Sequence, residues 1–319
     1  MSITARHTDF DVVWLGARVL LLEGRNPWQL IGPGREVDWL WPLIYPGTAL
    51  VAVAPFAVLP LEWARSLFVG ASATALAWAV TRDGWWRLTL FVSVPVLHAM
   101  VSAQWSLLVA AAFLLPALGG VAAIKPTVGL ATVASAPHER WQWVALASGV
   151  ALLAVSLAVA PTWVLDWRRE VAGAQHLSPP VAHWRVGGPL VLLALLRWRR
   201  PEARWLVALA CVPQSTVPYE AVYFMLFPCT RVGLLALTVL SYGAGALHYW
   251  IVGVATSTVD LQYRAGDALV ALFYLPALWM VLRRENRGET PRWLDAVAAV
   301  VWRAFGRRVN AAASGGPGG

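Results

Sequence analysis

The sequence predicts an all-α polytopic membrane protein. Hydrophobic residues make up 59% of the 319 positions and charged residues only 13%, against about 25% charged in an ordinary soluble domain. Long runs rich in Leu, Ala and Val show no strict alternation, which favours helices over strands. Because backbone groups in lipid need partners inside the chain, we expect a helical bundle whose main surrounding medium is the lipid bilayer.

Three regions follow from the order of apolar, proline-rich and charged stretches. Residues 1–60 are expected to form a first external loop with juxtamembrane helices. Residues 61–282 are expected to form the transmembrane bundle, which includes an external loop at 161–187. Residues 283–319 form a basic cytoplasmic tail that ends in a Gly-rich segment.

Within this plan, a surface helix is predicted over 10–23 and a proline-interrupted helix over 43–60 that does not cross the membrane. Several predicted spans are shorter than the roughly 20 residues that a perpendicular helix needs. Short, proline-broken helices are tolerated where the backbone faces protein or water, so we expect an internal cavity. The predicted spans are 61–81, 88–102, 104–118, 120–136, 143–160, 188–197, 205–217, 221–230, 232–250 and 267–282.

Arginines between the spans predict the orientation, since short cytoplasmic loops are enriched in basic residues. The net charge of +8 is dispersed over these loops and forms no basic domain, so no nucleic-acid partner is expected. The chain is predicted to be a multi-pass protein of the inner or plasma membrane, with its site on the external face. The cytoplasmic segments are 82–87, 138–142, 197–204 and the tail, and the external ones are 1–60, 161–187 and 251–266.

The sequence contains no Gly-rich phosphate loop, metal-binding helix or nucleophile elbow. We therefore expect no metal and no cofactor. The two cysteines, Cys211 and Cys229, lie among apolar residues and are predicted to be buried free thiols.

Asp9 stands just before the predicted surface helix, and Asp11 lies at its start. Carboxylates at positions i and i+2 do not share a helix face, so only one of them is expected to face a cleft. An equally plain alternative is that Asp9 caps the helix at its N-terminus, which aspartate does well.

Lys125 is the single lysine among 25 basic residues, and it lies in an apolar segment before a proline. Such a lysine either faces a wet interior or a partner charge, or it extends to the membrane interface. Both readings stay open. In the external loop, Arg168 and Arg169 are candidate phosphate ligands. Near the late helices, Gln214, Tyr219 and Glu220 form a further polar group, and Glu220 needs a partner or a wet face.

Several motifs, taken in order, resemble glycosyltransferase family 87. They are Asp9-Phe10, AR at 17–18, EGRNPW at 23–28, YPGTALVAVAPFAVLP at 45–60, Ala103-Gln104, IKP at 124–126 and PQSTVPYEAVYFMLFP at 213–228. Together they span nearly the whole chain.

The resemblance implies a GT-C-like helical bundle that takes a sugar, commonly mannose in this family, from a polyprenyl-phosphate donor. The acceptor would be a lipid or a glycan. It further implies that Asp9 is the general base for an inverting transfer. Lys125, with Arg168 and Arg169, is expected near the donor phosphate, where developing negative charge needs a cationic partner. Asp11, Gln104, Gln214, Tyr219 and Glu220 are expected on the acceptor side or along the cavity.

The chain departs from the family pattern at three places. Only eight residues precede Asp9, where the family has a transmembrane helix, so we expect the reading frame upstream of Met1 to encode one. Gly47 replaces the second proline of Tyr-Pro-Pro, and a histidine common in the late block is absent. Two other function classes therefore stay open: a transporter or flippase, and a catalytically inactive accessory protein of GT-C type.

Overall fold

The protein is almost entirely helical, which confirms the predicted all-α class. The computed structural model describes residues 8–136, 139–174, 180–183, 186–213, 215–300 and 303. Within these ranges the only sheet is a two-residue parallel pair, β1 (Ile31–Gly32) with β2 (Val37–Asp38).

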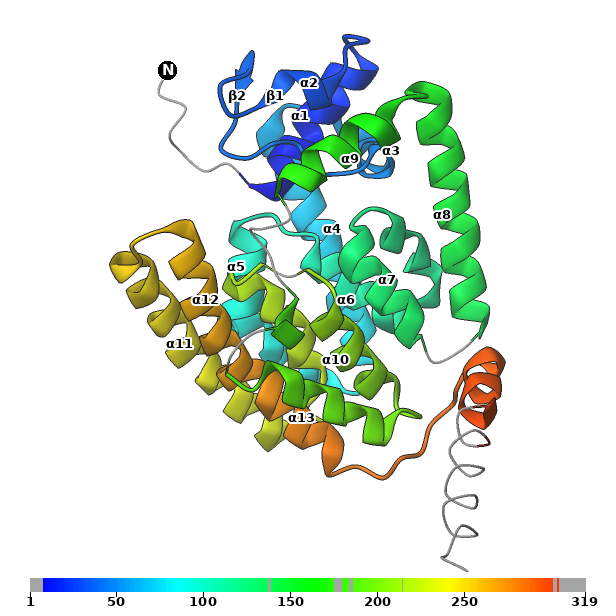
Figure 1. Ribbon diagram of the computed structural model, residues 1–319, viewed down its shortest axis with the longest axis vertical. Helices are drawn as coiled ribbons and strands as arrows, with labels where there is room; N and C mark the ends of the chain where they lie inside the picture. Colours follow the sequence, from blue (N-terminus) through cyan, green and yellow to red (C-terminus); the bar gives the residue numbers. More distant parts are fainter. Residues whose placement is uncertain are drawn as a thin grey trace, which may run out of the picture.

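An outer layer covers one end of the helical bundle (Figure 1). Ion pairs and hydrogen bonds from the segment after α1 hold α9 in this layer: Arg35 lies 2.9 Å from Glu170, and Asn26 donates to Asp166 over 2.8 Å. Phe10 of α1 stacks on Phe68 of the bundle, 4.5 Å between ring centroids. The layer consists of β1, β2, α1 (Asp9–Leu21), α2 (Pro27–Leu30), α3 (Gly47–Val53), η1 (Ala54–Phe56) and α9 (Trp163–Ala174).

Long apolar helices form the outside of the bundle. Three of the described helices are long and apolar enough to cross a bilayer: α8 (Glu139–Val159), α11 (Arg231–Val254) and the continuous helix Val259–Leu282. The last joins α12 (Thr258–Leu269) to α13 (Leu275–Leu282) through a π-helical turn, η8 (Val270–Tyr274). Only 11% of the apolar window of α8 is buried. Exposed apolar surface of this extent marks an interaction with a partner or a membrane.

A bent pair of helices precedes these three in the chain. Residues Gly47–Phe56 and α4 (Leu61–Thr81) are long and apolar enough to cross a bilayer only when taken together, and they are bent by 105° at the break. The proline-rich segment thus turns sharply into α4, whose bounds are those of the span predicted at 61–81.

Six predicted spans are not long helices. In their place the chain forms helical hairpins that turn inside the bundle, and three of their turns lie at Ala103, at Lys125 and between Cys211 and Pro218. Many of the short helices begin at or next to a proline, which lacks the N–H that an interior helix position would donate. The pieces are η2 (Trp85–Val92), α5 (Val94–Val101), α6 (Ser106–Leu114), η3 (Pro116–Ala123), α7 (Pro126–Ser135), η5 (Val181–His183), η6 (Gly188–Arg197), α10 (Pro201–Cys211) and η7 (Pro218–Leu226).

The hairpin turns lie toward the outer layer. Thr48 of α3 donates to the carbonyl of Ala123, 2.6 Å away, just before the turn at Lys125. Trp105, next to the turn at Ala103, packs on Phe68 with 4.7 Å between ring centroids. Ala103 itself has a φ of 44°, a left-handed conformation that costs a residue with a side chain about 1–2 kcal/mol. The backbone reversal therefore depends on its packed surroundings.

The cysteines correct one prediction. Cys211 and Cys229 are both exposed and free. In a chain whose outer surface is apolar, apolar neighbours do not indicate burial.

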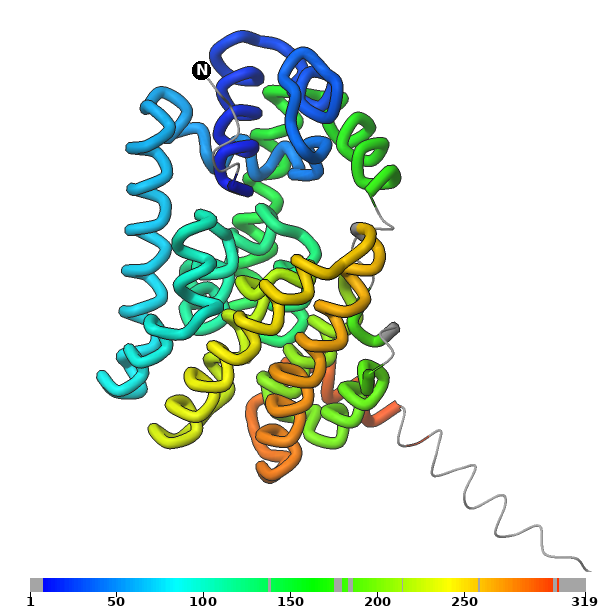
Figure 2. The backbone as a smooth tube through the Cα atoms, turned by 90° about the vertical axis from the view of Figure 1, so that its left-hand side faces the viewer, coloured from blue at the N-terminus to red at the C-terminus, as the bar shows by residue number. Residues whose placement is uncertain are grey.

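Basic residues collect at the opposite end of the bundle from the outer layer. The C-terminal end of α4, the start of α8, the start of α10 and the end of α13 all lie there (Figures 1 and 2). The segments that we predicted to share the cytoplasmic side, 82–87, 197–204 and the start of the tail, therefore lie at one end. We call it the arginine-rich end.

This geometry yields a topology prediction. In a chain whose native Cys211 and Cys229 are replaced by serine, Gln29→Cys in the outer layer should react with an impermeant maleimide in intact cells. Arg140→Cys, at the start of α8, should react only after permeabilisation. Both positions are exposed, so access decides the outcome. If only Arg140→Cys reacted in intact cells, the orientation in the membrane would be the opposite of the predicted one.

Candidate functional site

Asp9 lies in the first turn of α1, and a hydrogen bond from Tyr45 fixes its carboxylate. The Tyr45 hydroxyl donates to its Oδ2 atom over 2.7 Å. No other side chain in the described part of the chain is seen to hydrogen-bond to Asp9. Asp9 is partly exposed, while Tyr45 is buried. A buried phenol therefore orients an accessible carboxylate.

The alternative role of Asp9 as helix cap is wrong. The N-cap is Thr8, whose side chain accepts from the backbone N–H of Asp11, while the Asp11 carboxylate accepts from the N–H of Thr8 at 3.0 Å. This reciprocal pair is a capping box and satisfies the exposed N–H groups of the helix start.

Asp11 belongs to this structural arrangement and not to the cavity side that we predicted. Its two carboxylate oxygens accept from Arg65 of α4 at 3.0 and 2.7 Å, and the residue is 3% exposed. The two aspartates do point in different directions, as their spacing predicts. Asp11 faces the bundle helix α4, and Asp9 faces Tyr45.

Lys125 and Glu220 form a buried ion pair between two hairpin turns. Their Nζ and Oε1 atoms are 2.8 Å apart, and the side chains are 16% and 3% exposed. Of the two open readings for Lys125, a partner charge in the interior is therefore the one observed. Tyr219 lies beside the pair: its ring centroid is 5.8 Å from Nζ.

These two pairs belong to one group. The Asp9 carboxylate interacts electrostatically with Lys125 and with Tyr219, and Tyr45 interacts with Tyr219 and Glu220. We call Asp9, Tyr45, Lys125, Tyr219 and Glu220 the outer cluster. It joins the outer layer to two hairpin turns, so it forms only when α1, η3–α7 and α10–η7 are packed together.

Burial, reinforced by the neighbouring Asp9 carboxylate, raises the pKa of the Tyr45 phenol well above its usual value. Tyr45 is therefore protonated at all physiological pH values and can only donate to Asp9. A fixed donor on one carboxylate oxygen leaves the other oxygen as the acceptor for a substrate proton.

Buried polar atoms without partners adjoin the outer cluster. Among the described residues, Oε2 of Glu220 and the hydroxyl of Tyr223 are buried with no hydrogen-bond partner. Oε1 of Gln104, in the turn between α5 and α6, is also unpartnered there. Glu220 and Tyr223 are three residues apart in the 3₁₀ helix η7, which places them on the same face. Unsatisfied buried polar groups cost free energy and are normally bound to water or a ligand. The interior beside Glu220 thus has polar atoms that can still form hydrogen bonds with water or a polar ligand.

The predicted loop arginines are not part of the outer cluster. Arg168 and Arg169 are exposed on α9, and Arg169 pairs with Asp166 at 3.2 Å in the same helix. Their assignment to a donor phosphate stays a prediction that no described contact supports. Gln214 lies outside the described residues.

The position of Trp163 explains why a glycine stands at position 47. A Cβ atom at position 47 would stand 2.8 Å from the ring of Trp163, below any normal contact distance. The tryptophan of α9 therefore occupies the space where a larger residue would project.

Sequence reasoning missed two participants. Tyr45 was noted only as part of a motif, because nothing in the sequence relates it to a carboxylate 36 positions earlier. His98 of α5 contacts Tyr219 edge-on, with 5.7 Å between ring centroids, and so borders the outer cluster. A polar aromatic residue next to a proline turn was the available signal for Tyr45.

Comparison with family models, curated proteins and solved structures finds no match to this chain. The resemblance to glycosyltransferase family 87 therefore stands on the quoted motifs alone. Any function must be argued from the outer cluster itself.

The environments of the two aspartates predict different stability effects. Asp11→Asn removes the charge that Arg65 faces and should lower the free energy of unfolding by about 3 kcal/mol, the low end for breaking a buried pair, because Arg65 is 29% exposed. Asp9→Asn should change stability by less than about 1 kcal/mol, the worth of one hydrogen bond. Thermal unfolding in detergent measures both, and equal losses would contradict the assignment.

Proposed function

We propose that this chain is a membrane glycosyltransferase of GT-C type that moves a sugar from a polyprenyl-phosphate donor to a lipid or glycan acceptor. The observation that carries the proposal is the Asp9 carboxylate. Asp9 is partly exposed, and Tyr45 fixes one of its carboxylate oxygens. It belongs, with Lys125, to the outer cluster at the end of the bundle away from the arginine-rich end. The motif order around Asp9 and Lys125 points to the same chemistry.

In the proposed step, Oδ1 of Asp9 accepts the proton of the acceptor hydroxyl. That oxygen attacks the anomeric carbon from the face opposite the donor phosphate. The bond between the anomeric carbon and the phosphate oxygen breaks, its electron pair stays on the leaving polyprenyl phosphate, and the configuration inverts. General base catalysis of this kind typically contributes 10²–10⁴-fold.

Lys125 would stabilise the departing phosphate. Glu220 occupies one of the three N–H donors of its ammonium group, which leaves two for phosphate oxygens. The pairing also lowers the cost of keeping a lysine in an apolar bundle. Glu220 thus acts as a positioning residue that holds the cation at the hairpin turn.

One feature favours the alternative of a transporter. Helices that break inside a bundle, with charged residues at the breaks, are also typical of transporter binding sites. A transporter would need the Lys125–Glu220 pair but would not need Asp9 as a base. The inactive accessory protein would need neither. Substitution of Asp9 therefore separates the enzyme from both alternatives.

Asp9→Asn should abolish most of the activity while the protein still folds. The amide keeps the shape and can accept from Tyr45 but is not basic, so sugar transfer should fall by roughly 10²–10⁴-fold. The measurement is transfer of radiolabelled mannose from polyprenyl phosphate in membranes that contain the protein.

The matched control is Glu62→Gln, an exposed acidic residue in the first turn of α4, which should transfer at the parent rate. If Asp9→Asn transferred sugar at the parent rate, Asp9 would not be the base, and the proposal that the chain is an enzyme would lose its support.

Lys125 is tested with charge-balanced variants, because Lys125→Met alone would leave the buried Glu220 uncompensated. Lys125→Arg should retain much of the activity. The double variant Lys125→Met with Glu220→Gln should fold, yet bind the polyprenyl-phosphate donor at least 10-fold more weakly, a loss of about 1.4 kcal/mol. Donor binding to proteoliposomes gives the affinity. Unchanged affinity in the double variant would show that the pair is only structural.

A further inference from the structure

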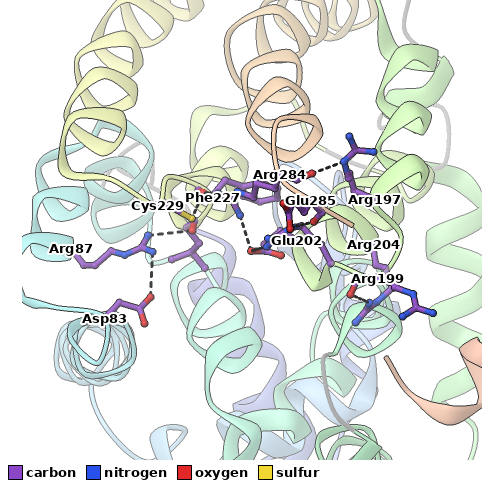
Figure 3. Close-up of polar contacts among 12 residues, drawn as sticks. Asp83, Arg87, Arg197, Arg199, Glu202, Arg204, Phe227, Cys229, Arg284 and Glu285 are labelled. Carbon is purple, nitrogen blue, oxygen red and sulfur yellow. Dashed lines mark hydrogen bonds and ion pairs between the residues drawn. The ribbon is translucent and has the colours of Figure 1, made fainter. Parts of the chain in front are cut away.

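Two arginine-rich segments are joined at the end of the bundle opposite the outer cluster. Residues 197–204 and 283–289 read RWRRPEAR and RRENRGE, and we call them together the arginine latch. They are linked by a hydrogen bond from Arg197 to the carbonyl of Arg284 (Figure 3). Arg200 also donates to the carbonyl of Glu285, and the N–H of Arg199 donates to Asn286.

Backbone carbonyls satisfy many of the arginine N–H groups. Arg204 donates to the carbonyls of Trp198 and Arg199 and, across to α7, to those of Ser135 and Ala136. Arg284 likewise donates to the carbonyl of Phe227. These bonds complete the carbonyls left over at helix ends. They do not cancel charge, because a carbonyl is only a dipole.

The latch therefore carries excess positive charge. It holds seven arginines and three glutamates, a net charge of +4. Glu202 is already shared between Arg284 at 2.8 Å and Arg200 at 3.8 Å. Burial lowers the pKa of Arg204 to about 10, which still leaves it protonated at neutral pH. Like charges held this close repel one another unless an anion is present.

Two exposed arginines of the latch lack a carboxylate partner among the described residues. Arg199 lies over Trp198, 5.2 Å from the ring centroid, and Arg283 lies over Trp279 at 4.6 Å. Stacking on a tryptophan uses the face of the guanidinium and leaves its N–H edge available. That planar edge matches two phosphate oxygens.

Unpartnered atoms inside the latch point to a bound guest. Within the described residues, Nε of Arg204 is buried without a hydrogen-bond partner, and so is Nε of Arg87 beside the latch; Oε2 of Glu202, an acceptor, is also unpartnered there. Arg87 and Arg204 are each 8% exposed. Buried guanidinium N–H groups normally have an acceptor, so the latch has unused donors as well as uncompensated charge.

We propose that the arginine latch binds a phosphate group, carried by the headgroup of an anionic lipid or free in solution. Arg199 and Arg283 supply the exposed N–H edges, and the carbonyl-bound arginines beneath them supply the positive field. The site lies at the arginine-rich end, away from Asp9, and is independent of the proposed glycosyl transfer.

The test uses the full chain in nanodiscs of phosphatidylcholine and measures its thermal unfolding midpoint. One arm replaces part of the lipid by phosphatidylglycerol, and a second adds inorganic phosphate at constant ionic strength. Free phosphate at about ten times its dissociation constant should raise the midpoint by about 2–4 °C. The double variant Arg199→Gln with Arg283→Gln should lose this rise.

The matched control is Arg82→Gln with Arg231→Gln, two exposed arginines at the same end but outside the latch. It should keep the rise, which excludes general attraction to a charged surface. A rise with phosphatidylglycerol only identifies a lipid headgroup, and a rise with inorganic phosphate as well identifies a site for the phosphate group itself. An equal rise in the parent and in the latch variant would overturn the proposal.

Discussion

A lysine and a glutamate are each costly to remove from water, and Lys125 and Glu220 lower that cost by lying 2.8 Å apart inside an apolar bundle. The pair joins the turn between η3 and α7 to the start of η7, 95 positions later. Tyr219 takes its position from the same turn, and Thr48 bonds the outer layer to the residue two before Lys125. Among the described residues this ion pair is the only hydrogen-bonded link between the two turns beneath Asp9, so the outer cluster depends on it.

The sequence predicts which segments belong to the bundle better than it predicts where each helix begins, breaks and turns back. Hydropathy identifies the apolar stretches, and the helix at 61–81 has the predicted bounds because no proline interrupts it. At 88–102 and 120–136 the same signal is misleading: α5 begins one residue before Pro95 and α7 begins at Pro126, each after a break. Whether an apolar segment crosses the bundle or turns back inside it depends on packing against neighbouring helices, and hydropathy does not contain that information.

The candidate site shows a similar division. Asp9, Lys125, Tyr219 and Glu220 can each be singled out in the sequence because charged or polar groups are rare in apolar surroundings. Their meeting is a property of the tertiary structure. The role of Asp11 is also invisible in the sequence, because it depends on Arg65, which reads as an ordinary polar residue in a helix. The i, i+2 spacing does predict that the two aspartates diverge, and that local rule holds.

The contact between Gly47 and Trp163 links the evolution of two distant positions. Gly47 follows Tyr45 by two residues, and Tyr45 orients Asp9, so a bulkier residue at 47 would press on Trp163 and displace the backbone that carries the phenol. Neither position can change size alone without disturbing the carboxylate. Related chains with proline at position 47 should therefore carry a smaller side chain at position 163, and the two should covary.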